Sequence, residues 1–181
     1  LKKSININKK DLKFSFSIPD GYMKMYPKSE NTIIYFEKQE YLGNKIWLQS
    51  VLLQTFPIED FPILININEV DFRKMLKVDF KNLSVKYYEL EGNMGYLEKH
   101  VADNMAVLVL STIMGNKLLK FGIAKNYTKG ENQGLMENEV RLFFNIIESI
   151  KFNKQLNSYS ELFDKSRQES KEDLIKYFTD Y

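Results

Sequence analysis

The chain has 181 residues with 44% hydrophobic side chains, no cysteine and a formal net charge of +2. The absence of cysteine excludes disulfides, thiolate zinc sites, iron–sulfur clusters and cysteine nucleophiles. The small net charge and the preference for lysine over arginine disfavour nucleic-acid binding, because the planar arginine fork is the usual reader of phosphates and base edges.

Strand signals begin near the start of the chain. A short strand is expected from Lys13 to Ile18, ending at Pro19-Asp20-Gly21, a strong turn signal. A hairpin is expected next, from about Thr32 to Thr55, because Gly43-Asn44 separates two strand-like runs and its glycine supplies the positive φ of a type II′ turn. The following segment, Phe56 to Ile65, holds two prolines, which predict a loop packed by its own apolar side chains.

A four-stranded meander is expected from Ser84 to Lys125. Gly92-Asn93 and Gly115-Asn116 repeat the type II′ turn signal at its first and last turns. Asp103-Asn104 is a weaker candidate for the middle turn, since both residue types tolerate the left-handed region. Three two-residue turns predict an antiparallel sheet in which each strand neighbours the next.

Two stretches place apolar residues at helical spacing, and each predicts a helix with one buried stripe. The first stretch runs from Glu69 to Leu83 and the second from Leu135 to Ser149. Their stripes consist of Phe72, Met75, Leu76, Phe80 and Leu83, and of Met136, Val140, Phe143, Phe144 and Ile147.

The last part of the chain carries an interrupted apolar stripe. It begins at Tyr159 to Phe163 and resumes at Leu174 to Phe178, with a polar stretch from Lys165 to Asp173 between. Two interpretations stay open: a surface helix docked by its two ends, and an arm that folds onto a partner. No linker or repeat marks a second domain, so we expect one domain over residues 1–153 with a helical extension over residues 154–181.

Membrane crossing is not expected, because the longest apolar stretch, Met105 to Met114, is far shorter than the ~20 residues that a bilayer requires. The chain opens with Leu1-Lys2-Lys3 rather than methionine. A removed signal peptide accounts for this opening, and so does a trimmed chain. We expect an exported protein, periplasmic or secreted, with a cytoplasmic location as the alternative.

Two segments resemble the PsbP-like families. Phe14-Ser15-Phe16-Ser17-Ile18-Pro19-Asp20-Gly21-Tyr22 looks like their opening strand and turn, and Phe144-Asn145-Ile146-Ile147-Glu148-Ser149-Ile150-Lys151-Phe152 resembles their closing helix. These families include the PsbP photosystem subunits, the DcrB-like periplasmic lipoproteins and chaperones for secretion-system effectors. The resemblance implies an antiparallel sheet flanked by helices and a habit of binding other proteins; it brings no catalytic residues with it.

The predicted turns fix which side chains of the meander share a face. One face is apolar and should carry the helices; it holds Leu97, Val101, Leu108, Leu110, Leu119, Phe121 and Ile123. The other face is polar, and its candidate binding residues are Tyr87, Glu89, Tyr96, Glu98 and His100. In this register Tyr87 lies opposite Glu98, and Glu89 lies opposite Tyr96. Of the aromatic side chains, only Tyr87 and Tyr96 are expected to be exposed.

Three interpretations of this polar face stay open. It is a solvated sheet face whose acids pair with lysines such as Lys120, a docking surface for a partner, or a weak divalent-cation site. Enzyme chemistry has little support: His100 is the only histidine, and the chain has no Gly-x-Ser-x-Gly, Walker or Gly-x-Gly-x-x-Gly motif. A pair of carboxylates that meets in the fold stays open.

These observations predict an α+β domain with an antiparallel sheet of about six or seven strands, helices on the Leu97/Phe121 face and an added C-terminal helix. We expect a non-enzymatic binding or accessory protein whose partner is another protein, with no cofactor and no nucleic acid. The alternatives are a small carboxylate-dependent hydrolase or lyase, and a dedicated chaperone or immunity-like protein for a secreted effector.

Overall fold

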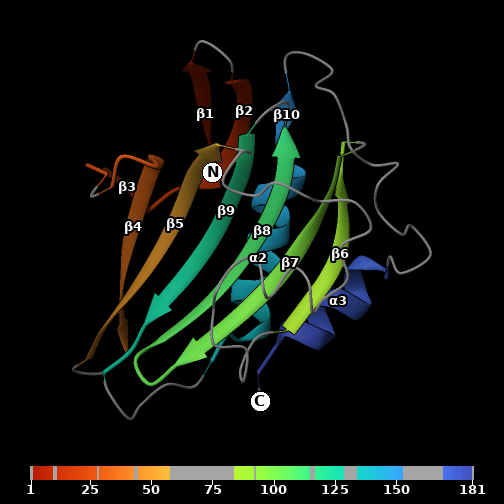
Figure 1. Cartoon of the computed structure of the whole chain (residues 1–181). Coiled ribbons are helices and arrows are strands. Elements are labelled where there is room, and N and C mark those ends of the chain that lie inside the picture. Colours follow the sequence, from red (N-terminus) through yellow and green to blue (C-terminus); the bar gives the residue numbers. More distant parts are fainter. Residues whose placement is uncertain are drawn as a thin grey trace.

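The structure is a computed structural model of the whole chain, shown in Figure 1. It describes residues 2–9, 12–27, 29–42, 45–57, 84–91, 93–114, 117–128, 134–152 and 169–180. The fold is α+β, with antiparallel sheets and two helices in the described part of the chain.

The larger sheet has seven strands in the order β3-β4-β5-β9-β8-β7-β6 (Figure 1). Every neighbouring pair is antiparallel, and the predicted hairpin and meander are both confirmed. The strands are β3 (Met23–Met25), β4 (Thr32–Leu42), β5 (Lys45–Pro57), β6 (Ser84–Leu90), β7 (Asn93–Ala102), β8 (Met105–Met114) and β9 (Lys117–Asn126).

Three of the four predicted turns are confirmed by the strand register. Leu42 pairs with Lys45 around Gly43-Asn44, and Met114 pairs with Lys117 around Gly115-Asn116. Ala102 pairs with Met105 around Asp103-Asn104. Two-residue connections therefore join these strands at the predicted positions. Neither Asp103 nor Asn104 has a positive φ, so the middle turn does not use the left-handed conformation on which its prediction rested.

The predicted turn at Gly92-Asn93 is wrong, because Leu90 pairs with Asn93 and the connection consists of Glu91 and Gly92. Glu91 has φ +48°, in the left-handed region. Its carboxylate accepts a hydrogen bond from the backbone N–H of Phe152 (3.1 Å) and pairs with the ammonium of Lys151 (3.2 Å). These contacts from a distant segment favour Glu91 at the turn, and no local sequence signal announces them.

This correction moves every β6–β7 partner by two residues. Tyr87 lies opposite Tyr96 instead of Glu98, and Glu89 lies opposite Met94 instead of Tyr96. Side chains alternate between the two faces with a period of two, so the shift leaves each side chain on its predicted face.

A second, three-stranded sheet has the order β1-β2-β10. Its strands are β1 (Lys2–Lys9), β2 (Leu12–Pro19) and β10 (Lys151–Phe152). The predicted strand from Lys13 to Ile18 lies within β2, and the chain turns after it at Gly21, which has φ +96°. The second sheet and β1 were not predicted, because β1 has Ile5 and Ile7 as its only apolar residues.

The helices α2 (Glu137–Glu148) and α3 (Lys171–Phe178) lie on the same face of the larger sheet as the small sheet (Figure 1). Rings from both sheets meet here: Phe121 lies edge-on to Phe14, with ring centroids 5.7 Å apart. The predicted helix-bearing face is confirmed. Leu97, Leu108, Leu110, Leu119, Phe121 and Ile123 are buried in one core with α2 and α3, and Val101 packs against it.

Some predictions lie outside the described residues. These are the helix from Glu69 to Leu83, the part of the predicted loop after Pro57, and the apolar group from Tyr159 to Phe163. The helix predicted from Leu135 to Ser149 is confirmed as α2. Neither α2 nor α3, the helices in the described part of the chain, is long and apolar enough to cross a membrane.

Candidate functional site

The five candidate residues of the polar face come from β6 and β7, and the strand pairing places all of them on the face opposite the helices. Tyr96 and Glu98 are buried, with 2% and 7% of their surface exposed, so the expectation of a solvated face is wrong for these two. Glu89 and His100 are half-buried. The structure describes the backbone of Tyr87 but not its side chain.

Glu98 is the most perturbed group on this face. Burial raises the pKa of its carboxyl above the ordinary value of 4.5, while the nearby Lys120 ammonium and Ser111 hydroxyl act in the opposite direction. Lys120 Nζ lies 3.8 Å from Glu98 Oε1, at the outer limit of an ion pair. Glu98 therefore holds a proton more tightly than an exposed glutamate does.

Ser111 is the member of this cluster that the sequence analysis missed. It lies directly across β7–β8 from Tyr96 and across β8–β9 from Lys120. Its hydroxyl is fully buried; it is close enough to lower the pKa of Glu98 but is not placed to donate a well-formed hydrogen bond to a described residue. Nδ1 of His100 is likewise buried without a hydrogen-bond partner in the described structure.

The described residues hold no group of three or more His, Cys, Asp or Glu side chains that could share a metal ion. A divalent-cation site on this face would need Glu89 and Glu98 close together. The strand pairing instead places Met94 opposite Glu89 and Val85 opposite Glu98. This cluster consists of the buried Glu98 carboxyl beside the Lys120 ammonium and the Ser111 hydroxyl.

A second polar cluster lies on the helix side of the larger sheet. Lys125 forms a buried ion pair with Glu139 in the first turn of α2. The other carboxylate oxygen of Glu139 accepts the backbone N–H of Met136 (2.6 Å), which caps the helix. Beside the pair, the Tyr127 hydroxyl donates to the carbonyl of Gly134. Burial first, and then the charges of Glu139 and Asp180, raise the pKa of Tyr127.

Lys99 makes a comparable connection to the C-terminal segment. Its ammonium donates to Asp180 Oδ1 (2.7 Å) and to the carbonyl of Phe178 (3.2 Å). Asp180 also joins this segment to the entry of α2: its Oδ2 accepts the N–H of Leu135 (2.8 Å), and its own N–H donates to the Leu135 carbonyl (2.7 Å). These bonds fasten α2 and α3 to the sheet.

The sequence held a signal for this cluster. In the predicted meander Lys99 and Lys125 fall on the apolar face, where Lys99 lies opposite Leu108 and Lys125 lies opposite Ala106. A lysine on a buried face needs a counter-charge. The acids that supply it, Glu139 and Asp180, come from segments whose positions the sequence alone did not give.

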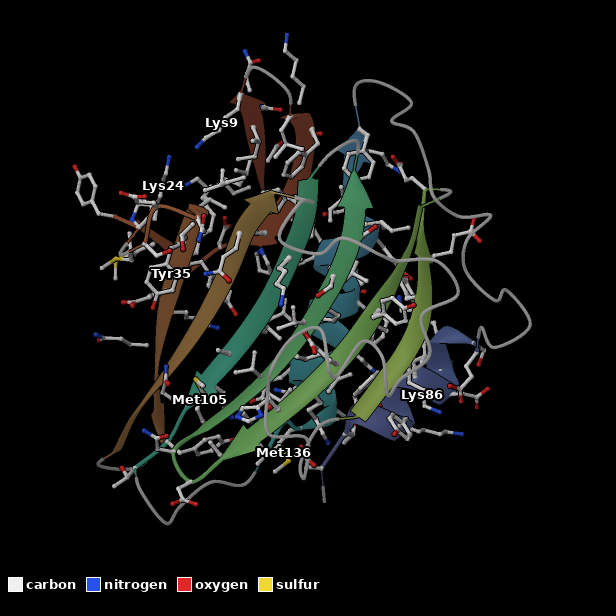
Figure 2. All side chains as sticks on the ribbon, in the orientation of Figure 1. Lys9, Lys24, Tyr35, Lys86, Met105 and Met136 are labelled. Atoms are coloured by element: carbon white, nitrogen blue, oxygen red, sulfur yellow. The ribbon has the colours of Figure 1, made fainter. Side chains whose placement is uncertain are left out.

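The edge strand β3 carries the third feature. Met23, Met25 and Tyr26 are 59%, 37% and 94% exposed. They account for three of the four large apolar side chains exposed in the described part of the chain, and Tyr177 (44%) is the fourth. Figure 2 shows Lys24 and Tyr35 at the same outer edge of the larger sheet. The sequence analysis missed this surface because it assigned nearly all aromatic residues to the core.

No family model matches the chain, and no curated protein matches it. A crystal structure from Bacteroides thetaiotaomicron VPI-5482 is similar, with 12% sequence identity and a TM-score of 0.44. The match covers 78% of this chain and 46% of the other, so the chain spans about half the length of that neighbour.

Proposed function

We propose that this protein is a non-enzymatic binding or accessory protein that acts by contacting another protein through β3. The observation that carries the proposal is the exposure of Met23 and Met25 on the edge strand β3 and of Tyr26 directly after it. Contiguous exposed apolar side chains on a folded domain mark interaction sites. Tyrosine is a frequent binding anchor, and methionine adapts its shape to a partner.

The positions of the buried Glu139 and the half-buried Asp180 favour binding over catalysis. Glu139 and Asp180 each contact a lysine and a backbone N–H, and both hold helices in place. A carboxylate occupied in this way stabilises the fold rather than reacting with a substrate. The polar face stays a prediction as a docking surface; because Tyr96 and Glu98 are buried, a partner would reach it at Glu89 and His100.

A PsbP-like fold and an exported location form part of the proposal. The two segments that resemble these families lie side by side, because β10 pairs with β2. The Phe14 and Phe152 rings are 5.8 Å apart, and Ser149 Oγ accepts the N–H of Ser17 (2.7 Å). This contact supports treating the two segments as one structural unit. Fractionation of the source cells tests the location: recovery in the cytoplasm alone would contradict export.

Site-specific crosslinking tests the binding surface. A photoreactive aromatic residue at position 26 should form a covalent adduct with a specific partner in the source cells. The same residue at position 177, the exposed tyrosine of α3, serves as the matched control. Adducts at both positions, or at neither, would count against β3. A secreted effector as the trapped partner would establish the dedicated chaperone or immunity-like alternative.

The raised pKa of Glu98 favours one second candidate, a carboxylate-dependent hydrolase or lyase. A buried glutamate with a raised pKa is a better candidate for a general acid than an exposed one. Glu98→Gln should then abolish turnover of any ester or glycoside that the protein cleaves, while Glu89→Gln on the same face leaves turnover unchanged. Equal turnover in the two variants would remove this candidate.

A further inference from the structure

The outer face of the small sheet has an unusual composition. Along β2, Leu12, Phe14, Phe16 and Ile18 are buried, so the residues between them point outward. Strand pairing adds the even-numbered residues of β1 and Lys151 of β10 to this outer face. Apart from Pro19, the outward residues are serine, asparagine and lysine, and the charged ones are Lys2, Lys13 and Lys151. We call this surface the lysine face.

The charge of the small sheet is one-sided. Its three strands contain five lysines and no acidic residue, in a chain whose formal net charge is +2. Lys151 is 70% exposed and pairs with Glu91 at 3.2 Å. The other four lysines, Lys2, Lys3, Lys9 and Lys13, are exposed and form no ion pair with any described residue. The small sheet therefore concentrates positive charge, and of the charged residues on the lysine face, Lys2 and Lys13 form no ion pair with a described residue whereas Lys151 pairs with Glu91.

We propose that the lysine face docks on the surface of an anionic lipid bilayer and contacts its phosphate groups. The ammonium groups match a negatively charged surface, and the short hydroxyl and amide side chains between them can donate hydrogen bonds to phosphate oxygens. Lysine acts as a flexible point charge, which suits a bilayer that presents dense charge without a fixed shape.

Other polyanions fit this face less well. The outward positions include no arginine to grip a nucleic-acid phosphate in two places and no aromatic ring on which a base could stack. A specific protein partner would require a buried anchor of the tryptophan, tyrosine or arginine type, and the lysine face carries none. Charge attraction of this kind is weak, reversible and sensitive to salt.

The lysine face is separate from the protein-binding surface proposed at β3. Met23 and Met25 pair with Glu37 and Tyr35 on β4, whose neighbour Phe36 points to the opposite, buried side of the larger sheet. The small sheet covers that buried side. The two surfaces therefore face different directions, and one molecule can lie on a membrane while its β3 edge stays accessible.

Vesicle co-sedimentation of the 181-residue chain tests the proposal. The protein should pellet with phosphatidylcholine vesicles that contain phosphatidylglycerol, not with pure phosphatidylcholine vesicles, and added salt should release it. Each lysine near an anionic surface contributes about a fivefold factor to the partition coefficient. The double reversal Lys2→Glu with Lys13→Glu should therefore weaken partitioning at least roughly 25-fold.

The matched control reverses two lysines of α3, Lys171→Glu with Lys176→Glu, which lie outside both proposed surfaces, and it produces the same net charge. It should partition within about threefold of the unmodified protein, with long-range charge as the cause of any difference. Three results would overturn the proposal: no binding to anionic vesicles, equal losses in the two double variants, or tighter binding to duplex DNA than to anionic vesicles. All variants should first give unchanged circular dichroism and melting temperatures.

Discussion

Lys125 and Glu139 meet where β9 passes the first turn of α2, and both side chains are buried. Breaking a buried ion pair costs more stability than breaking an exposed one, because the remaining charge loses its counter-charge without regaining water. Glu139→Gln keeps an oxygen that can accept the Met136 N–H and removes only the charge. We expect the free energy of unfolding to fall by about 3 kcal/mol or more in urea titrations.

Arg141 on the same helix is the matched control, since its ion pairs with Glu137 and with Glu172 of α3 both lie at the surface. Arg141→Gln should leave the urea midpoint nearly unchanged. Equal losses of stability in the Glu139 and Arg141 variants would show that the buried pair contributes no more than a surface pair.

Gly134 and Gly21 both have positive φ, at +72° and +96°, but their surroundings differ. A Cβ at Gly134 would lie 2.3 Å from Asp180 Oδ2, whereas a Cβ at Gly21 would find Lys38 Cε at an ordinary 3.6 Å. Gly21→Ala should cost only backbone strain, about 1 kcal/mol. Gly134→Ala must also displace Asp180, so calorimetry should give it a melting temperature several degrees lower than that of Gly21→Ala. The reverse order would contradict this account.

The raised pKa of Glu98 makes its effect on stability depend on pH. Below the ordinary glutamate pKa of 4.5, the carboxyl is protonated in both the folded and unfolded chains, and burial carries no charge penalty. As the pH rises past that value, the unfolded chain releases the proton first, so the folded protein loses relative stability. The loss is complete above the pKa of the folded protein.

Glu98→Gln removes this penalty. Its unfolding free energy relative to the unmodified protein should therefore increase as the pH rises above 4.5, as measured by urea titration at each pH. An isosteric amide leaves Lys120 partly exposed, so the new cost on that side is small. A difference that stays constant, or shrinks, as the pH rises would show that Lys120 rather than burial governs Glu98.

Among the elements, α3 bears on one end of the interrupted apolar stripe; the other end, Tyr159 to Phe163, lies outside the described residues, so the choice between the two interpretations stays open. Leu174, Ile175 and Phe178 belong to the same core as the sheet, so this helix docks on the domain. The neighbours Phe178 and Tyr177 give a matched pair, at 0% and 44% exposed. Phe178→Ala should cost about 3–5 kcal/mol. Tyr177→Ala should cost less than about 1 kcal/mol, including its contact with the Lys86 ammonium.

Hydrogen exchange reports this difference directly. In Phe178→Ala the backbone amides of α3 should exchange much faster than in the unmodified protein, while those of β8 in the middle of the sheet are less affected. In Tyr177→Ala the α3 amides should keep their protection. Unchanged protection of α3 in Phe178→Ala would mean that the Lys99 and Asp180 contacts hold the helix without its apolar side.

Element prediction succeeded where the signal was local. Turn-forming residue pairs between strand-like runs predicted three of the four two-residue connections, and the period of the apolar residues predicted α2 and the buried face of the meander. Prediction failed where the local structure depends on a contact with a residue far away in the sequence. Glu91 occupies a turn because β10 meets it, and β1 forms a strand because β2 offers it an edge.

The candidate site was harder to predict than the fold for the same reason. Register gave the faces correctly, so Tyr96, Glu98 and Lys120 were rightly placed on the face away from the helices. Strand pairing tells which face a side chain lies on, but it does not tell whether that side chain is buried. Tyr96 was therefore expected to be exposed, whereas it is buried. The exposure of Met23, Met25 and Tyr26 was not predicted, because apolar residues in an exposed edge strand and in a half-buried strand follow the same sequence pattern.

At the scale of the whole molecule, buried chemistry and exposed chemistry are separated. Buried lysines and acids join the sheet to α2 and α3. The surface carries two distinct features, the apolar edge at β3 and the lysine face of the small sheet. This separation supports the proposed accessory role, with one surface for a partner protein and another for a membrane.

The most direct test of this account is capture of proteins from an envelope fraction of the source by the 181-residue chain and three variants. Met23→Lys with Met25→Lys should lose a specific partner that the unmodified protein retains. Tyr177→Lys, a charge introduced at the exposed apolar residue of α3, should retain it, and so should Glu89→Lys on the polar face. Retention of the same partner by the β3 variant, or its loss in Glu89→Lys alone, would contradict the proposal that β3 is the binding surface.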